Sequence, residues 1–421
     1  MSAHGKIGAL RASFIVAGNM IGSGVYLLPQ TLGAKGSSSM IGWLFAAGGA
    51  LLLAFVFAML FRLRPEREGM VRQVSGALGS FFGFQASFLY WLSGWIGNGA
   101  IAVTATSYLS VFFPVLREPV AGLACTLALV WFFTGLCFFG VRRVAEFGGV
   151  SLALGLLPVL GAAVLGWFAF DPELFRASWN PGGTPLTQSI PPTVIAIFWA
   201  FLGLESAAVV GALVRNPRRD VPIATLGGVA LTAALYVAAA AAMFGLLPAA
   251  ELAASSAPFA DVAARWMGAG AAALVAACAV LKTAGTLSGW ILCTAEASRS
   301  AADAGVFPRL LKEPADAAPR RNLLLTAALM TATLLLSASP VVGEQFRSLI
   351  SLATLVFMVL YLLCAAALLR ETRDWGVRAG AVLAGAFCVW AFVSASVGEM
   401  AFAAGLSLLA MALYPLARRA V

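Results

Sequence analysis

Apolar segments of about 20 residues recur along this chain, and they limit its possible folds more than any other feature. As a helix, a segment of that length spans the roughly 30 Å hydrocarbon core of a bilayer. Only 11% of the residues are charged, so a soluble fold would lack the polar surface to cover its core. The sequence therefore predicts an all-α integral membrane protein with twelve transmembrane helices. The predicted windows are 9–33, 40–61, 80–111, 120–139, 147–170, 191–214, 222–247, 266–296, 322–338, 348–369, 379–396 and 400–417.

The Lys and Arg residues behind the net charge of +9 are divided unevenly between the two sides of the membrane. With the N-terminus placed inside, 21 of the 27 Lys and Arg residues fall on the cytoplasmic side, as the positive-inside rule predicts for an even number of spans. We therefore expect a multi-pass inner-membrane protein with both termini cytoplasmic and no nucleic-acid partner. The single histidine, His4, lies in the N-terminal tail, so a histidine-based triad or metal site is excluded. No enzyme activity, metal or cofactor is expected.

The first apolar window is interrupted by a polar, glycine-rich segment, residues 17–26 (AGNMIGSGVY). A glycine weakens a helix by about 1 kcal/mol relative to alanine. Non-helical backbone at membrane depth persists only where protein or a polar cavity satisfies it. Close helix packing through glycines is the alternative explanation. The cluster Gly22-Ser23-Gly24, close to Asn19, favours an unwound segment.

The sixth window has a matching irregularity, because Gly203 and Glu205 fall near the midpoint of 191–214. An ionisable group at that depth is costly and marks a candidate functional site. Interruptions at matching positions of two five-span halves are typical of inverted-repeat transporters with a substrate site at the midplane. Half-helix N-termini suit a carboxylate, and unwound carbonyls suit an ammonium group. The residues alone therefore predict a site for a zwitterion.

Five motifs resemble the amino acid–polyamine–organocation superfamily, and within it the bacterial arginine/agmatine antiporter group and its basic amino acid and polyamine relatives. They are GNMIGSGVYLLP (18–29), YWLSGWIGN (90–98), FWAFLGLESA (198–207), RNPRRDVPIATLGG (215–228) and AADAGVFP (301–308). The resemblance implies one transporter domain over 1–421. It implies a 5+5 inverted repeat with broken helices 1 and 6, over 9–170 and 191–370, and two peripheral helices over 379–417.

The resemblance also implies a function, which is secondary active transport of amino acids by alternating access, usually as substrate exchange. A small amino acid or amine is then the substrate, and a homodimer is a candidate assembly in the lipid bilayer. The implied substrate-binding residues are Asn19, Met20, Gly22, Ser23, Gly24, Asn98, Trp199, Leu202, Trp290 and Tyr361. The implied coupling or gating residue at the second break is Glu205, at the position of a family glutamate that links the site to the cytoplasmic half.

Individual roles follow from the same resemblance. The N–H groups of Ser23 and Gly24 are expected to bind the substrate carboxylate. Carbonyls near Met20, Trp199 and Leu202 are expected to accept from its α-ammonium group. Trp290 would supply a stacking or cation–π face to the substrate side chain, beside Asn98, and Trp199 would also gate the site. Interhelical hydrogen bonding by Asn98 and interfacial packing of the tryptophans are the alternative interpretations.

Lys282 departs from the family pattern, which has a small residue near the middle of this eighth window. It lies eight residues before Trp290, about 12 Å along the helix and about 80° around it. A fixed cation there would oppose arginine or a dicationic polyamine, unless it is neutral or paired with Glu205. Burial favours the neutral amine, so Lys282 could also carry a proton. The alternative function is therefore a proton-coupled or facilitative carrier of neutral amino acids.

A second departure lies in the loop after the second window. The family's Gly-Gly-Ser-Tyr-like segment reads Glu68-Gly69-Met70-Val71 here. The aromatic residue and one glycine are missing, and the preceding residues 62–67 are highly charged. A cytoplasmic closure or pH response that depends on that segment is therefore not predicted for this chain.

Overall fold

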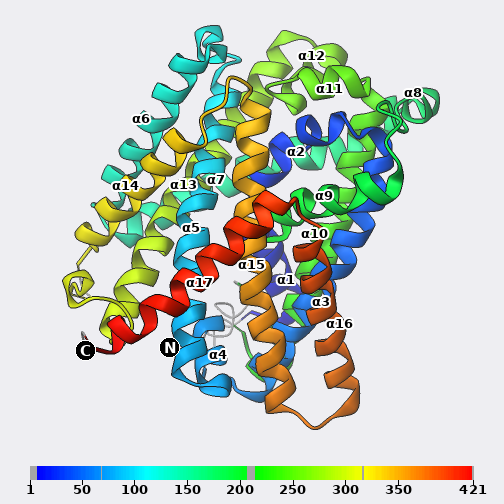
Figure 1. Cartoon of the computed structure of the whole chain (residues 1–421). Helices are drawn as coiled ribbons and strands as arrows, with labels where there is room; N and C mark the ends of the chain where they lie inside the picture. The colour runs from blue at the N-terminus through cyan, green and yellow to red at the C-terminus, as the bar shows by residue number, and fades with distance from the viewer. Residues whose placement is uncertain (1–6, 68, 206–213, 315–316, 420–421) are drawn as a thin grey trace.

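A computed structural model describes residues 7–67, 69–205, 214–314 and 317–419, and these are almost entirely helical (Figure 1). Within these ranges the one β interaction is an isolated bridge between Ile7 and Val214. In the described parts of the chain, eight helices are long and apolar enough to cross a membrane, and the bent pair α1–α2 makes a ninth crossing if it is one span. The prediction of an all-α membrane protein is confirmed.

Every predicted window coincides with helical structure. The first window contains α1 (Ala9–Met20) and α2 (Gly24–Gly33), and the sixth begins in α9 (Leu186–Phe198). Residues 206–213, the end of the sixth window, lie outside the described residues. The others contain α3 (Ser39–Leu63), α5 (Ser80–Leu109), α6 (Pro119–Cys137), α7 (Val141–Leu160), α10 (Pro217–Leu246), α13 (Ala269–Asp303), α14 (Arg320–Leu336), α15 (Val342–Glu371), α16 (Trp375–Val393) and α17 (Val397–Arg419).

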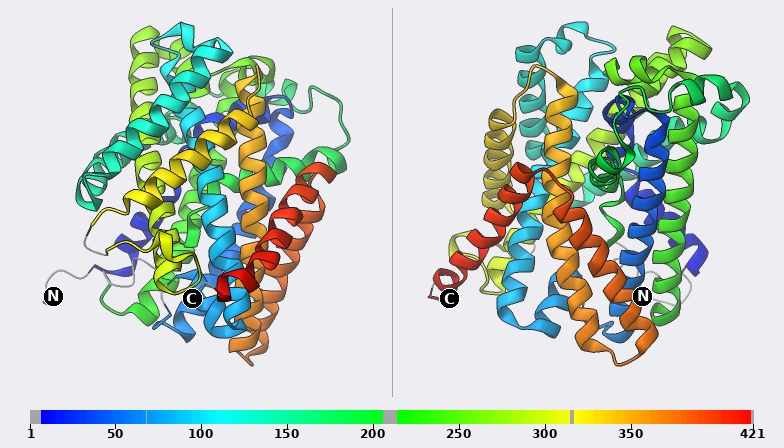
Figure 2. Two further views of the ribbon diagram at one scale, coloured as in Figure 1. Left: turned by 60° about the vertical axis from the view of Figure 1, so that its left-hand side comes forward. Right: turned by 45° about the vertical axis from the view of Figure 1, so that its right-hand side comes forward.

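The two ends of the helical bundle differ in what covers them. One end carries the short helix α4 (Met70–Leu78), and α17 ends on the same side (Figure 1). The opposite end is capped by α8 (Pro172–Ala177), α11 (Ala249–Ala254) and α12 (Pro258–Met267). Figure 2 shows the same division from two further directions. The helix α1 lies in the half with α4, and α2 lies toward the cap, so the first span crosses the bundle.

Burial separates central from peripheral helices. In the most apolar stretch of α15, 67% of the residues are buried, against 11% in α17. The central helices pack in pairs, with α5 against α13 and α15, and α10 against α1 and α3. The helix α5 is 30 residues long and carries buried polar side chains such as Ser93 and Asn98. Polar residues at the centre and apolar residues at the periphery fit a membrane protein with an internal polar site.

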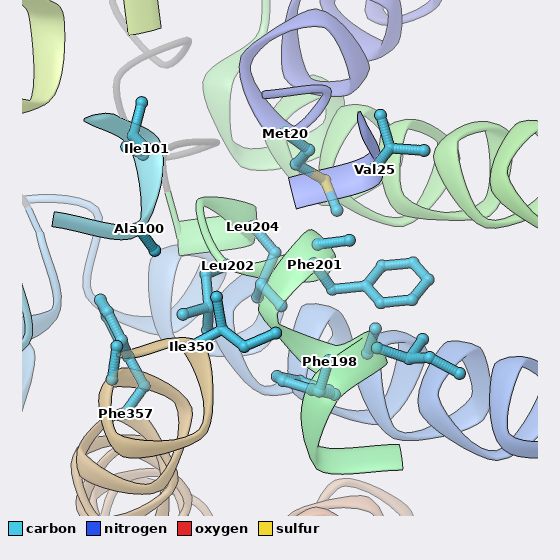
Figure 3. Packing of buried hydrophobic residues seen from close by; sticks show 14 of the residues in the cluster. Met20, Val25, Ala100, Ile101, Phe198, Phe201, Leu202, Leu204, Ile350 and Phe357 are labelled. Carbon is cyan, nitrogen blue, oxygen red and sulfur yellow. The ribbon is translucent and has the colours of Figure 1, made fainter. Parts of the chain in front are cut away.

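Apolar side chains from three spans meet where the first and sixth windows are interrupted. Figure 3 shows Phe201 and Leu204 between Met20 of the first span and Ile350 of α15. Phe201, Leu204 and Ile350 are fully buried, and Met20 is 3% exposed. This packing holds the two interruptions side by side at the core of the protein.

Candidate substrate-binding site

The first interruption is a bend of 55° between α1 and α2. Residues 21–23 are not helical, and Ile21 closes α1 with ψ of 88°. Gly24 begins α2 in close contact with the sixth window, since a β-carbon on it would lie 2.9 Å from Trp199 Cδ1 and 3.1 Å from Ala200 Cα. A larger residue at Gly24 would therefore push the two spans apart. The prediction of a broken first span is confirmed.

The second interruption follows α9 and a short 3-10 turn, Trp199–Phe201. Leu202 is extended, and Gly203 has φ of +103°, a backbone conformation that only glycine adopts readily. The Glu205 carboxylate accepts hydrogen bonds from Gly203 N at 3.1 Å and from the Tyr361 hydroxyl at 2.7 Å. Glu205 therefore ties the turn to α15.

A cavity of about 50 Å³ lies between the two interruptions. It is lined by Asn19, Met20, Gly22, Ser23, Gly24, Ser93, Gly94, Gly97, Asn98, Ile101, Trp199, Ala200, Leu202, Thr286, Trp290 and Phe357. Nine of the ten residues predicted to bind substrate are in this set, and Tyr361 is the exception. The described residues that line the cavity are all uncharged. The lining thus combines backbone of the two breaks with tryptophan, asparagine and hydroxyl side chains.

Trp199 lies across the cavity between two glycines. A β-carbon on Gly97 would lie 2.7 Å from Trp199 Cη2, and one on Gly24 would lie 2.9 Å from Cδ1. Both ends of the indole therefore rest on backbone that carries no side chain. The remaining space holds only a few waters. A solute of amino-acid size would fit only if Trp199 moved, and the gating role of Trp199 stays a prediction.

Asn98 and Trp290 connect α5 to α13 beside the cavity. Asn98 is 1% exposed, and its amide donates to Thr294 Oγ1 at 3.4 Å. Thr294 in turn donates to the Trp290 carbonyl at 2.7 Å. Asn98 thus makes an interhelical hydrogen bond and also lines the cavity, and its role in substrate binding stays a prediction. Trp290 faces the cavity at the core of the bundle, which separates it from interfacial tryptophans.

Lys282 lies outside the cavity lining. It is 5% exposed, and a methyl group on Gly155 of α7 would overlap its aliphatic stem. Gly285, one turn further along α13, faces Ser151 of α7 in the same way. Among the residues that the structure describes, Lys282 forms no ion pair, and Glu205 is bound by Tyr361 instead. Lys282 therefore packs in the interface between α7 and α13, where glycines leave space for its side chain.

Seven lining residues carried no predicted role. They are Ser93, Gly94, Gly97, Ile101, Ala200, Thr286 and Phe357. Helical spacing is the signal that could have found two groups of them. Gly94 and Ile101 lie four residues before and three residues after Asn98 on α5, Gly97 lies four residues before Ile101, and Thr286 precedes Trp290 by four.

The loop between α3 and α4 is tied to the end of α15 by an ion-pair cluster. Glu371 accepts from Arg64 Nε at 2.6 Å and from Arg67 Nη1 at 2.7 Å. The Gln73 amide donates to the carbonyls of both arginines. Glu68, part of the segment that departs from the family pattern, lies outside the described residues. Its charged neighbours thus make a contact with α15 that the sequence did not predict.

Comparison with known proteins places the chain in a family. The amino acid permease family matches residues 7–414. The chain is 38% identical over 425 residues to the cadaverine/lysine antiporter of Escherichia coli K12, covering 98% of this chain and 95% of that protein. It is 32% identical to the putrescine transporter PotE of the same strain, covering 86% and 83%. The Haemophilus influenzae PotE is 33% identical, covering 86% and 84%.

The family match extends over the described helices and both interruptions, and the relatives are transporters rather than enzymes. The superfamily predicted from the five motifs is therefore confirmed, and a twelve-span fold fits it. The chain belongs to the amino acid permease family of multi-pass membrane transporters.

Proposed function

We propose that this transporter exchanges a basic amino acid for the amine left by its decarboxylation. The observation that carries the proposal is the cavity between the two broken spans, with free N–H groups at the start of α2 and two tryptophan faces. Similarity to a cadaverine/lysine antiporter and to putrescine transporters supports the substrate class. The protein works by alternating access, so each substrate crosses in the occupied site as that site turns to the other side of the membrane.

The first break binds the amino acid end of the substrate. The amides of Ser23 and Gly24 donate to the carboxylate, aided by the positive end of the α2 dipole. The α-ammonium donates to the carbonyls of Met20 and Leu202. The Met20 carbonyl already accepts from Tyr236 Oη at 3.2 Å, and its second lone pair serves the substrate.

The opposite wall of the cavity binds the distal ammonium group. Trp290 offers an aromatic face for a cation–π contact, and Asn98 and Ser93 supply polar oxygens. Both a basic amino acid and a diamine carry an ammonium group at that end, so this wall serves both substrates. An uncharged lining holds either cation without binding it too tightly to release.

Trp199 and Glu205 couple binding to the change of access. Trp199 moves from its rest between Gly24 and Gly97 when a substrate enters, and it closes over the substrate. The turn that carries Trp199 is held to α15 through Glu205 and Tyr361. Motion of the gate is thus transmitted along α15 to the end of the bundle where Glu371 binds Arg64 and Arg67.

The remaining features of the proposal concern placement. The protein lies in the inner membrane with both termini cytoplasmic, which the distribution of Lys and Arg supports. The two five-span repeats cover 9–170 and 191–370, with one interruption in each, and the peripheral pair covers 379–417. A homodimer is the proposed assembly.

Counterflow in proteoliposomes tests the exchange. Purified protein is reconstituted into vesicles loaded with L-lysine, cadaverine or buffer, and uptake of labelled L-lysine is followed. Either internal substrate should accelerate uptake at least about tenfold over buffer-loaded vesicles, because the loaded carrier returns faster than the empty one. Gly24→Leu in the same vesicles is the control for a blocked site. Equal uptake into all vesicles would contradict exchange.

A second candidate function is a proton-coupled or facilitative carrier of neutral amino acids. Lys282 favours it, because a basic side chain two turns from Trp290 has no ion-pair partner among the described residues. In the counterflow assay this function gives uptake of labelled leucine or alanine that a proton gradient drives or that needs no internal substrate. L-lysine and cadaverine then compete weakly.

A further inference from the structure

One hydroxyl of α13 differs from its neighbours along the helix. Four buried hydroxyls donate to carbonyls of their own helix, from Thr283 to Ala279, Ser288 to Gly285, Thr294 to Trp290 and Ser298 to Ala295, at 2.7 to 3.0 Å. Thr286 Oγ1 is also buried, but it has no hydrogen-bond partner among the described residues. The backbone carbonyls of α13 are available to the Thr286 hydroxyl as they are to the other four, but this hydroxyl donates to none of them.

An unpaired buried hydroxyl destabilises a protein, so each such group needs an explanation. Serine and threonine in helices usually bond to the carbonyl three or four residues earlier. Strain does not explain the exception, since Thr286 lies in the regular part of α13. A hydroxyl kept free inside a binding cavity is available to a ligand.

The position of Thr286 indicates which part of a ligand it meets. It lines the cavity, and a β-carbon on Gly22 would lie 3.4 Å from its Cγ2 and 4.0 Å from its Oγ1. Across the same break, Trp199 Nε1 is also buried without a partner, 3.1 Å from the β position of Gly24. Two unpaired donors therefore lie beside the glycines on either side of Ser23. Such a group of donors suits an anionic group of a ligand.

We propose that Thr286 donates a hydrogen bond to the α-carboxylate of the substrate and so sets the preference for an amino acid over its decarboxylated amine. This inference rests on the proposed exchange and adds a specificity residue on α13 to the binding groups of the first break. An amino acid brings an acceptor to the hydroxyl. A diamine brings no acceptor, so the hydrogen bond that the hydroxyl donates to a carboxylate is absent when the diamine binds.

The test compares substrates that differ only in the carboxylate. Dissociation constants for L-lysine and cadaverine are measured on the purified full-length protein and on Thr286→Val, Thr286→Ser and Thr283→Val. Valine keeps the shape of threonine and removes the hydroxyl. Thr283→Val makes the same change one turn away, at a hydroxyl that is bonded to Ala279 and lies outside the cavity lining.

Thr286→Val should weaken L-lysine binding about tenfold and change cadaverine binding less than about twofold, because a hydrogen bond to a charged group is lost for one substrate alone. Thr286→Ser should retain L-lysine binding within about threefold, and Thr283→Val should affect both substrates equally. A matching loss for both substrates in Thr286→Val would overturn the proposal and indicate packing. Unchanged L-lysine binding would also overturn it.

Failure of the proposed function gives a different result. A wild-type protein that binds neither L-lysine nor cadaverine contradicts the substrate class. The four proteins are then compared on the amino acid that most raises the melting temperature of the wild type, and on the amine from its decarboxylation. The ratio of the dissociation constants for that amino acid and its amine then tests the role of Thr286. A wild type that binds no amino acid overturns both proposals.

Discussion

The two interrupted spans reach the same cavity by different means. The first break presents mainly backbone, with residues 21–23 between two half-helices bent by 55° and Gly24 at the start of the second. The second break carries large side chains, since Trp199 precedes it and Glu205 follows it. The structure of the first break thus requires only that its residues be small. The second depends on the hydrogen bonds and packing of particular side chains.

This difference indicates a division of labour. A break of small residues has little that can move except the half-helices themselves, so it suits a fixed binding edge. A break whose turn is tied to α15 by Glu205 and Tyr361 can move as a unit and pass that motion on. We therefore expect bulk to damage the first break, and loss of hydrogen bonds or aromatic rings to damage the second.

The largest effect is expected from added bulk at the first break. Gly24→Leu places a side chain against Trp199 and Ala200 and covers the amides that bind the carboxylate. Overpacking and the loss of charge-assisted hydrogen bonds together weaken L-lysine binding at least about a thousandfold. Isothermal titration on purified protein measures it. Gly48→Leu, at a glycine of α3 with open space beside it, is the control and should bind normally. Normal uptake by Gly24→Leu would refute the midplane site.

At the second break, removing a side chain should matter more than adding one. Glu205→Ala leaves Gly203 N and the Tyr361 hydroxyl without their acceptor, which lowers the free energy of unfolding by about 2–4 kcal/mol. Glu205→Gln keeps an acceptor oxygen and should lose less than half as much. Thermal melting and counterflow rates measure both variants. A melting temperature unchanged by alanine would mean that Glu205 does not brace the turn.

Trp290 lies outside both breaks and tests whether the distal wall acts separately from them. Trp290→Leu removes the aromatic face and should weaken cation binding about thirtyfold, from a cation–π contribution of about 2 kcal/mol. The melting temperature should fall only slightly. Trp390→Leu on the peripheral helix α16 is the matched control. If Trp290→Leu collapses stability while the remaining protein binds normally, Trp290 is a packing residue.

Lys282 should give the smallest effect, because it lies at the α7–α13 interface and not in the cavity lining. At about 12 Å and an effective dielectric of about 20, like charges repel by about 1.4 kcal/mol, at most about tenfold in affinity. Lys282→Met should raise the affinity for cations relative to neutral amino acids by no more than that. Competition assays from pH 5 to 8 measure the ranking. A larger rise would place Lys282 at the substrate and favour the neutral carrier.

The spans and the breaks could be predicted because each has a local signature. Apolar length alone locates the windows. Glycines beside Asn19 and a carboxylate at position 205 are unusual in the middle of a membrane span, whatever the neighbouring helices are. These features need no knowledge of neighbours, so the sequence was sufficient for them.

Pairings between distant segments could not be predicted in the same way. The contact of Glu371 with Arg64 and Arg67 joins residues about 300 positions apart, and nothing in the loop marks its partner. The unpaired state of Thr286 is a property of its surroundings, because Thr283 on the same helix does donate to a carbonyl of that helix. The placement of Lys282 against Gly155 likewise depends on how α7 docks on α13.

The uncharged lining of the cavity has an electrical consequence. Among the described lining residues none carries a formal charge, so the lining adds nothing to the charge of the cargo in a loaded site. Under the proposed exchange, a monovalent amino acid entering against a divalent amine leaving moves one positive charge outward per cycle. A membrane potential of 100 mV, negative inside, opposes that step by about 2.3 kcal/mol. The amine gradient must then exceed the amino acid gradient by roughly fortyfold before export proceeds.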